Sequence, residues 1–441
     1  MKRFYEKHIK EKIQAFDIFE LGNSFVLFYI ALFFTIPTLV YFGLPSLIPG
    51  NFFYADDKPM SFVAVLYLFL GISFFIAGYW VNIFKKWRVP GNDIFRGPWT
   101  PRRTAFVFGL VFAAGLALKA VNIALGIYSH FGKNLSVVNG SLYSIIGLLN
   151  LIGPLSLALA FAYYFYLLRE GNRLYKAWRV VAWLSFALES LYGFFSWSHF
   201  SVIVPLMIYL IVRHYAYKKS FLQIILAALL ISFAIIPSQS FFRNKDLFFI
   251  GHKGQSSVNA PNGELETRVG RFVFNTSIRR VDQSRIVEAL FTKTEHFLYG
   301  KTLLNFFVSL GPPRFIWKDK PVTNADGNEL GRRYGVLTPD DLGTSVGPTV
   351  VGDLYMNFGL WGITLGMFLF GSFLKFIYDY FIVHTSRSLS GIMAYSIVWI
   401  EVIKGMEDWI APVYAGLVKL MVIIVAVCLL LKSEQISITT K

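Results

Sequence analysis

Two blocks of apolar runs, each run long enough to cross a lipid bilayer, constrain the fold of this chain of 441 residues. Runs such as 221–236 and 418–431 contain almost no polar residue. About 20 apolar residues are enough for a helix to cross about 30 Å of hydrocarbon, whereas a barrel strand would alternate apolar and polar residues. The sequence therefore predicts an all-α polytopic membrane protein with about ten transmembrane helices.

The expected spans form a first block at 23–241, with about seven spans, and a second block at 347–432, with about three. They lie near 23–48, 61–84, 104–128, 142–168, 180–196, 198–212, 220–241, 347–382, 389–408 and 411–431. Between them a polar segment, 242–346, holds 15 of the 42 Lys and Arg and 11 of the 26 Asp and Glu. Polar inserts of this length are usually functional or disordered, and its interspersed aromatic residues argue against disorder.

The basic residues of the short connections predict the orientation of the helices. Lys and Arg number five in 1–22, one in 49–60, six in 85–103, one in 129–141 and four in 169–179. Because Lys and Arg of short loops stay cytoplasmic, we expect both termini, including the tail 433–441, in the cytoplasm and the protein in the cytoplasmic (inner) membrane. Apolar residues at helical spacing among lysines predict that 1–22 is an amphipathic segment on the inner surface.

The placement of the polar segment depends on residues 180–212. One helix of this length would measure about 50 Å, far more than the bilayer needs. The polar string Ser196-Trp197-Ser198-His199 offers a break. With two spans here, 242–346 is a large extracytoplasmic loop. With one span it would be cytoplasmic, and the functional argument would invert.

The net charge of +16 does not indicate nucleic-acid binding, because most basic residues outside the polar segment lie in short loops that orient helices. The chain has a single cysteine, Cys428, and seven scattered histidines. Neither pattern is typical of a metal site. We expect no metal, no cofactor and no nucleic-acid partner.

Several ionisable residues fall within the expected spans, where charges are costly and suggest function. Lys119, Glu189, Glu401 and Lys404 all lie in the outer halves of their helices under this topology. One interpretation is a polar chamber that opens outward, with Glu401 as a general base. The other is a set of paired ions that hold the helices together, which we favour for Lys119 and Glu189.

Arginines and aromatic residues of the polar segment are candidates for binding a phosphorylated sugar. Guanidinium groups match phosphate oxygens bidentately and stay charged, which suggests Arg279, Arg280 and Arg314. The alternative for the first two is a solvated amphipathic helix. Trp317 and Tyr299 either stack on sugar rings or lie in the interfacial aromatic belt, which is the commoner role.

Four strings of the chain carry a family resemblance. They are Phe297-Leu298-Tyr299-Gly300-Lys301-Thr302, Gly311-Pro312-Pro313-Arg314-x-x-Trp317-x-x-Lys320-Pro321, Gly343-Thr344-Ser345 and Gly352-Asp353-x-Tyr355-x-Asn357-Phe358-Gly359-x-x-Gly362. Over about residues 279–372 the chain resembles the bacterial O-antigen polymerase (Wzy-type) and oligosaccharide repeat-unit polymerase family. The Arg-x15-Gly pattern of members with arginine-rich outer loops is absent. The resemblance implies an enzyme that joins polyprenyl-diphosphate-linked oligosaccharides outside the cytoplasmic membrane, and we expect a GT-C-like arrangement of helices.

This chemistry assigns roles to the candidate residues. Transfer from a diphosphate carrier needs positive charge at the leaving group and a base for the acceptor hydroxyl. The expected diphosphate ligands are Arg314 and Lys320, followed by Arg279, Arg280, Arg332 and Arg333. The expected bases are Asp353, then Asp282 and Glu401, and the expected sugar-binding residues are Trp317, Tyr299 and Tyr355. For Asp353, capping of a helix N-terminus is an equally good interpretation.

The leading hypothesis is a glycosyltransferase that polymerises repeat units, carried on a lipid such as undecaprenyl diphosphate, into surface polysaccharide of O-antigen (lipopolysaccharide) or capsule type. The expected partners are the lipid-linked oligosaccharide, the bilayer, a chain-length regulator and a flippase. Two alternatives stay open: an O-antigen ligase or other lipid-carrier-dependent glycosyltransferase, and a transporter or flippase for the same lipids.

Overall fold

The structure, a computed structural model, describes residues 17–42, 60–87, 92–124, 152–195, 199–217, 221–243, 282–312, 316–317, 319–321, 327–340 and 345–432. Its helices are α2 (Leu21–Tyr41), α4 (Phe62–Val81), η1 (Asn92–Phe95), α5 (Pro101–Ala124), α7 (Ile152–Arg169), α8 (Tyr175–Phe195), α9 (His199–Ala216), α10 (Phe221–Leu230), η3 (Ile231–Ile235), α11 (Ile236–Arg243), α14 (Ser284–Lys293), α15 (Lys301–Leu310), α16 (Gly327–Arg333), α17 (Thr349–Trp361), η5 (Gly362–Gly366), α18 (Met367–Tyr378), η6 (Asp379–Val383), α19 (Leu389–Lys404), η7 (Gly405–Glu407) and α20 (Ile410–Leu431). The described residues contain no β-strand, only an isolated bridge between Trp99 and Lys432.

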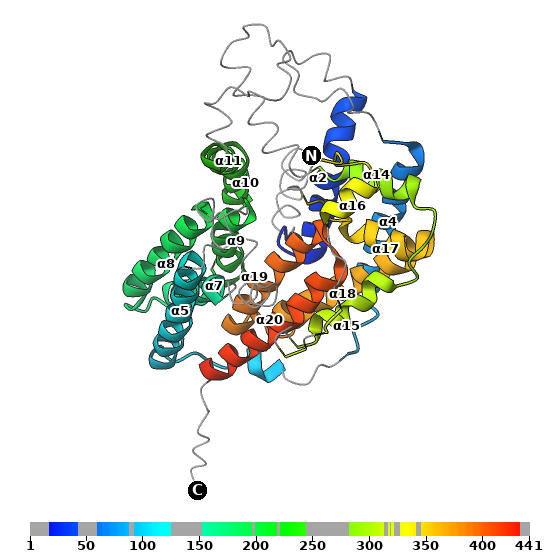
Figure 1. The fold of residues 1–441 in the computed structure, drawn as a ribbon. Helices are drawn as coiled ribbons and strands as arrows, with labels where there is room; N and C mark the ends of the chain where they lie inside the picture. Colours follow the sequence, from blue (N-terminus) through cyan, green and yellow to red (C-terminus); the bar gives the residue numbers. More distant parts are fainter. Residues whose placement is uncertain are drawn as a thin grey trace, which may run out of the picture.

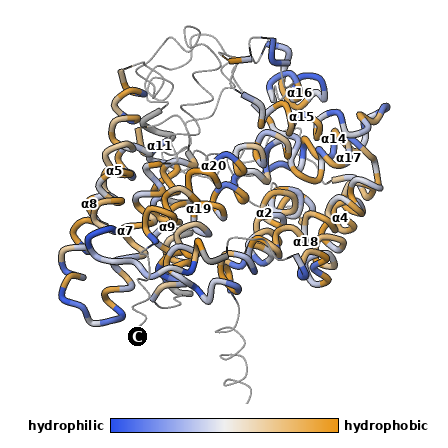
Figure 2. The backbone as a smooth tube through the Cα atoms, turned by 90° about the horizontal axis from the view of Figure 1, so that it is seen from below, coloured by the Kyte–Doolittle hydropathy of each residue, from blue (hydrophilic) through white to orange (hydrophobic). Residues whose placement is uncertain are grey.

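The chain is an all-α membrane protein. Seven described helical stretches are long and apolar enough to cross a membrane: Leu21–Tyr41, Phe62–Val81, Pro101–Ala124, Ile152–Arg169, Thr349–Val383, Leu389–Glu407 and Ile410–Leu431. The other three expected spans correspond to α8, α9 and the stretch from α10 to α11, which are helical but are not among those seven. Figure 2 shows long hydrophobic stretches along these helices and hydrophilic residues gathered at helix ends and around α16.

The expected break in residues 180–212 is confirmed, because α8 ends at Phe195 and α9 begins at His199. The two helices form an antiparallel hairpin. The rings of Trp183 and Tyr209, each over ten residues from the break, lie 5.4 Å apart between centroids. The side of the membrane that the polar segment occupies stays a prediction.

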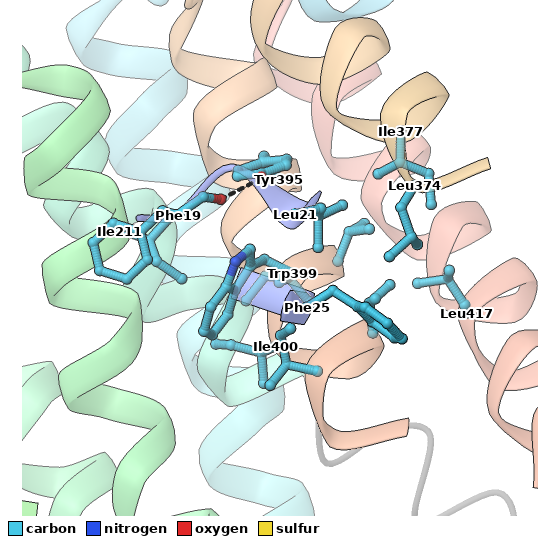
Figure 3. Close-up of a cluster of buried hydrophobic side chains, with 14 of the residues drawn as sticks. Phe19, Leu21, Phe25, Ile211, Leu374, Ile377, Tyr395, Trp399, Ile400 and Leu417 are labelled. Carbon is cyan, nitrogen blue, oxygen red and sulfur yellow. Dashed lines mark hydrogen bonds between the residues drawn. The ribbon is translucent and has the colours of Figure 1, made fainter. Parts of the chain in front are cut away.

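Figure 1 shows two groups of helices with α19 and α20 between them: α5 and α7–α11 on one side, and α2, α4, α14 and α17 on the other. α19 packs against α7 and α9 of the first group and against α2 and α20. Its side chains are central to the core in Figure 3, where the Tyr395 hydroxyl donates a hydrogen bond to the Phe19 carbonyl at 2.5 Å. Trp399 Nε1 donates to Ser24 Oγ at 3.0 Å. These bonds fix the start of α2 to the centre of the protein.

Helix ends that the charge pattern assigns to the cytoplasm lie together in the structure. The contacts that join them are Glu20 with Lys375 at 3.1 Å, Asn82 with Asp379 at 3.0 Å and Trp99 with Ser390 at 2.8 Å. Each joins segments nearly 300 residues or more apart in the sequence. Helix ends that the basic residues assign to the same side of the membrane are therefore neighbours in the structure. Most of 1–22 and all of 433–441 lie outside the described residues.

The expected span 347–382 is helical along its length, but it is not straight. Gly359 has φ 61° and ψ −138°, which interrupts the helix. A Cβ atom on Gly366 would lie 2.7 Å from Leu354 Cδ2, although a straight helix would separate these residues by about 18 Å. The chain therefore folds back at Gly359, so that α17 lies beside η5. Gly362 and Gly366 both pack against Leu354, a close approach that small residues four positions apart on a helix permit.

Candidate functional site

Three helices meet at a buried carboxylate. Asp353 of α17 is fully buried, and its Oδ1 accepts a hydrogen bond from Thr302 Oγ1 of α15 at 2.6 Å. Its Oδ2 accepts from the backbone N–H of Ile410, the first residue of α20, at 3.0 Å. Asn357 Nδ2 donates to Asp353 Oδ1 at 3.1 Å and also contacts Thr302 Oγ1. We call these four residues the Asp353 node.

The first and last of the strings that resemble the polymerases lie against each other at the node. The N–H groups of Leu298 and Tyr299 donate to the carbonyls of Met356 and Asn357 at 2.9 and 3.0 Å. A Cβ atom on Gly300 would lie 3.1 Å from the Phe358 ring, and one on Gly359 would lie 2.7 Å from the Phe297 ring. The glycines at these two places let the backbones approach closely. Residues about 55 positions apart thus form one unit.

The three expected bases have different surroundings. Both carboxylate oxygens of Asp353 accept protein hydrogen bonds, so its position suits holding three helices together, including a cap at the start of α20. Asp282 Oδ1 accepts from Ser284 N, at the start of α14, at 3.3 Å. Glu401 Oε2 lies 4.0 Å from Lys404 Nζ. Within the described residues, no hydrogen bond or ion pair joins Asp282 or Glu401 to the node.

Asp408 is a carboxylate of the node's border that the sequence did not single out as a base. It is exposed, and its Oδ1 accepts the N–H of Trp409 at 2.8 Å. The next residue along the chain is Ile410, whose N–H binds Asp353. The N-terminus of α20 therefore carries one buried and one exposed carboxylate, both favoured by the helix dipole.

The expected phosphate ligands are only partly described. Lys320 Nζ donates to the carbonyls of Gly311 and Pro312, at 3.0 and 3.1 Å, so its ammonium group compensates the C-terminal end of α15. Arg332 and Arg333 end α16, with Arg333 exposed. In the described parts of the chain, no hydrogen bond or ion pair joins these three residues to the node. Arg279, Arg280 and Arg314 lie outside the described residues.

The expected sugar-binding aromatics differ in access. Tyr299 is 80% exposed and lies next to the node. Trp317 is 38% exposed and packs on Gly311, at the opposite end of α15. Tyr355 is buried, and its hydroxyl donates to the Phe291 carbonyl at 3.2 Å. Of the three, Tyr299 is the one with both exposure and proximity to the node.

Two lysines within spans have partners. Lys119 Nζ contacts Glu189 Oε1, and both side chains are buried, which confirms the pairing that we favoured. Lys419, in the middle of α20, was missed in the sequence analysis although charges at this depth are uncommon. Its Nζ donates to the Ser309 carbonyl at 2.6 Å. Ser309 lies near the end of α15, so α15 runs alongside α20 from Ile410 to Lys419 and is not a solvated part of the insert.

An apolar groove runs from the node along α15 and α18. Its volume is about 730 Å³, and it is open on one side. The wall formed by α15 includes Leu303, Phe306 and Phe307, while α20 contributes Ile410 and Tyr414. Leu354 of α17, next to Asp353, also lines the groove, as does Phe84, whose ring centroid lies 6.2 Å from that of Phe376 in the last turn of α18.

Within the described ranges, no three His, Cys, Asp or Glu side chains gather closely enough to hold a metal ion. Metal-independent chemistry stays a prediction, because two acidic pairs of the sequence, Asp56-Asp57 and Asp340-Asp341, lie wholly or partly outside the described residues.

Comparison with known proteins gives one match. Neither the curated proteins nor the solved structures contain a match to this chain. A family model, described as a domain of unknown function (DUF8712), matches residues 123–381. This range is more than half of the chain and includes α15 and α17 but not the start of α20. The chain therefore belongs to the DUF8712 family.

Proposed function

We propose that the protein is a membrane glycosyltransferase that joins polyprenyl-diphosphate-linked oligosaccharide repeat units into surface polysaccharide at the outer face of the cytoplasmic membrane. The observation that carries this proposal is the direct packing of 297–302 on 352–362 around the Asp353 node. Both segments belong to the resemblance to the O-antigen polymerases. If the resemblance to these polymerases were due to chance, the two segments that carry it would not be expected to lie in contact.

The start of α15 is the proposed place for the diphosphate. Lys301 is exposed there, and the N-cap residue Gly300 offers no side chain to cap the first turn. Uncapped N–H groups and the helix dipole favour an anion. Arg314, which lies outside the described residues, stays the second proposed ligand. Lys320 would act by fixing the loop after α15 through the carbonyls that it binds.

Asp408 is the proposed general base, and Asp353 is a positioning residue. A base must come within hydrogen-bond reach of the acceptor hydroxyl, which an exposed carboxylate at the border of the node can do. Asp353 is fully buried, and both of its carboxylate oxygens accept hydrogen bonds from the protein. Tyr299, exposed beside the node, is the proposed platform for a sugar ring.

Purified protein in lipid nanodiscs, supplied with lipid-linked repeat units, tests the proposal. We expect lengthened glycans on the lipid carrier. Transfer to a lipid A core would instead identify a ligase, and movement of the lipid across a vesicle membrane without new glycosidic bonds would identify a transporter. Either result, without chain lengthening, contradicts the polymerase assignment.

Matched variants test the roles of the two carboxylates. Asp408→Asn should lower the rate of chain lengthening by about 10²–10⁴-fold, the usual contribution of a general base, with no change in thermal stability. Asp353→Asn should lower thermal stability as well as rate. If Asp408→Asn retains wild-type activity, Asp408 is not the base.

A further inference from the structure

The apolar groove has the form of a channel for a chain and not of a closed chamber. Along α18 its lining runs from Trp361, before η5, to Phe373, a distance of about 18 Å at the rise of a helix. Its volume of about 730 Å³ is in the range of pockets that bury small ligands. The lining of the groove therefore extends along about 18 Å of helix, and the groove is not enclosed.

The open side of the groove faces hydrocarbon in a membrane. Leu365, Leu369 and Phe307 line the groove and are 55%, 48% and 69% exposed. α18 and α20 belong to stretches that are apolar and long enough to cross a bilayer. Water is not a favourable occupant of so apolar a space, and at this depth hydrocarbon chains are the available occupants.

We propose that this groove binds the isoprenoid chain of the lipid-linked substrate, with the phosphate end at the start of α15 and the chain running toward Phe84. The inference rests on the proposed function. Charge complementarity sets the direction: Lys301 begins the same helix whose later residues Leu303, Phe306 and Phe307 line the groove. An amphiphile with an anionic head therefore meets the cation and the apolar wall on consecutive turns of one helix.

Tyr414 contributes an aromatic ring to the wall of the groove. Tyr414 lines the groove, is 8% exposed, and its hydroxyl has no hydrogen-bond partner among the described residues. The rings of Phe370 and Phe373 pack edge-on against its ring at 5.9 and 5.8 Å. The hydroxyl oxygen is itself buried, so a chain in the groove meets the Tyr414 ring and not its hydroxyl. The choice of an isoprenoid chain over a saturated chain rests on the proposed function.

Filling the groove tests the assignment. Leu365→Trp and Leu369→Trp place larger side chains at its exposed rim, where folding should tolerate them. Leu429→Trp is the matched control. Leu429 is 52% exposed and lies in a span, like the two groove residues, but it does not line the groove. The probe is a polyprenyl monophosphate titrated against purified protein in nanodiscs, compared with a saturated alkyl phosphate of equal length.

We expect both groove variants to weaken polyprenyl phosphate binding at least about tenfold, and the control to stay within about twofold, at unchanged thermal stability. Unchanged binding in folded groove variants would overturn the proposal. Equal binding of the two probes by the wild-type protein would show that ordinary acyl chains occupy the groove, which also overturns it.

This binding assay needs no glycan transfer, so its result is independent of the polymerase test. If transfer fails while the groove variants lose binding, the enzyme assignment falls and the groove assignment stands. If transfer succeeds while the groove variants bind polyprenyl phosphate normally, the enzyme assignment stands and the groove assignment falls.

Discussion

The reversal of the chain at Gly359 is the feature that forms the candidate site, and replacing this glycine tests it. Gly359 adopts φ 61° and ψ −138°, a conformation that L-residues with a Cβ atom rarely occupy. A Cβ atom there would also lie 2.7 Å from Phe297 Cζ. Gly359→Ala therefore introduces backbone strain and a steric overlap at once.

The expected destabilisation follows from these two effects. A residue held in a sparsely populated region costs about 1–3 kcal/mol, and overpacking against a ring costs about 1–3 kcal/mol. Together they predict a loss of about 2–6 kcal/mol in the free energy of unfolding. Because Phe297 is 37% exposed, its ring can move away from the added methyl group. Such movement would bring the destabilisation toward the lower end of this range.

Two other glycines of the chain are matched controls. Gly109 in α5 and Gly416 in α20 have nothing within 4 Å of an added Cβ atom, so alanine there should be neutral or stabilise the helix by up to about 1 kcal/mol. Unfolding of the purified variants with increasing denaturing detergent, followed by tryptophan fluorescence, gives the comparison. If Gly359→Ala unfolds at the same detergent fraction as these controls, the chain does not reverse at Gly359 as described.

Two further predictions concern buried charges. Lys119→Met leaves Glu189 without its buried partner and should lower the free energy of unfolding by about 3–5 kcal/mol. The double variant Lys119→Met/Glu189→Leu should recover most of this loss in the same unfolding assay. Equal stability of the single and double variants would contradict the pairing. Lys419→Met leaves the Ser309 carbonyl unsatisfied and should cost about 1–3 kcal/mol. It should also increase proteolysis of the loop after α15, and wild-type protease resistance would show that α15 does not depend on Lys419.

Features that depend on length and composition could be predicted from the sequence. The apolar runs indicated the membrane class, and the excessive length of 180–212 indicated the break before α9, which the structure confirms. The same length argument applies to 347–382, which at about 54 Å is too long for one straight span. Gly359 was quoted in the resemblance, but its role in reversing the chain was not anticipated.

Features that depend on contacts between distant segments could not be predicted. α15 was expected within the solvated polar segment 242–346. It lies alongside α20 instead, joined to it by the contact of Lys419 and by the hydrogen bonds of the node. Nothing in the local pattern of 301–310 states which helix covers it. The interpretation of Asp353 as a helix cap is right about the kind of contact. The helix that it caps is α20, whose first residue, Ile410, lies 57 positions after Asp353.

The side of the membrane on which the node lies is the central claim, and cysteine labelling tests it most directly. In a Cys428→Ala background, Glu295→Cys places an exposed thiol just before α15, and Asn172→Cys places one between α7 and α8. An impermeant maleimide applied to intact cells with the outer barrier removed should label the Glu295→Cys variant at once, and the Asn172→Cys variant only after lysis. Labelling of the Glu295→Cys variant only after lysis would contradict a site that meets lipid-linked glycans at the outer face.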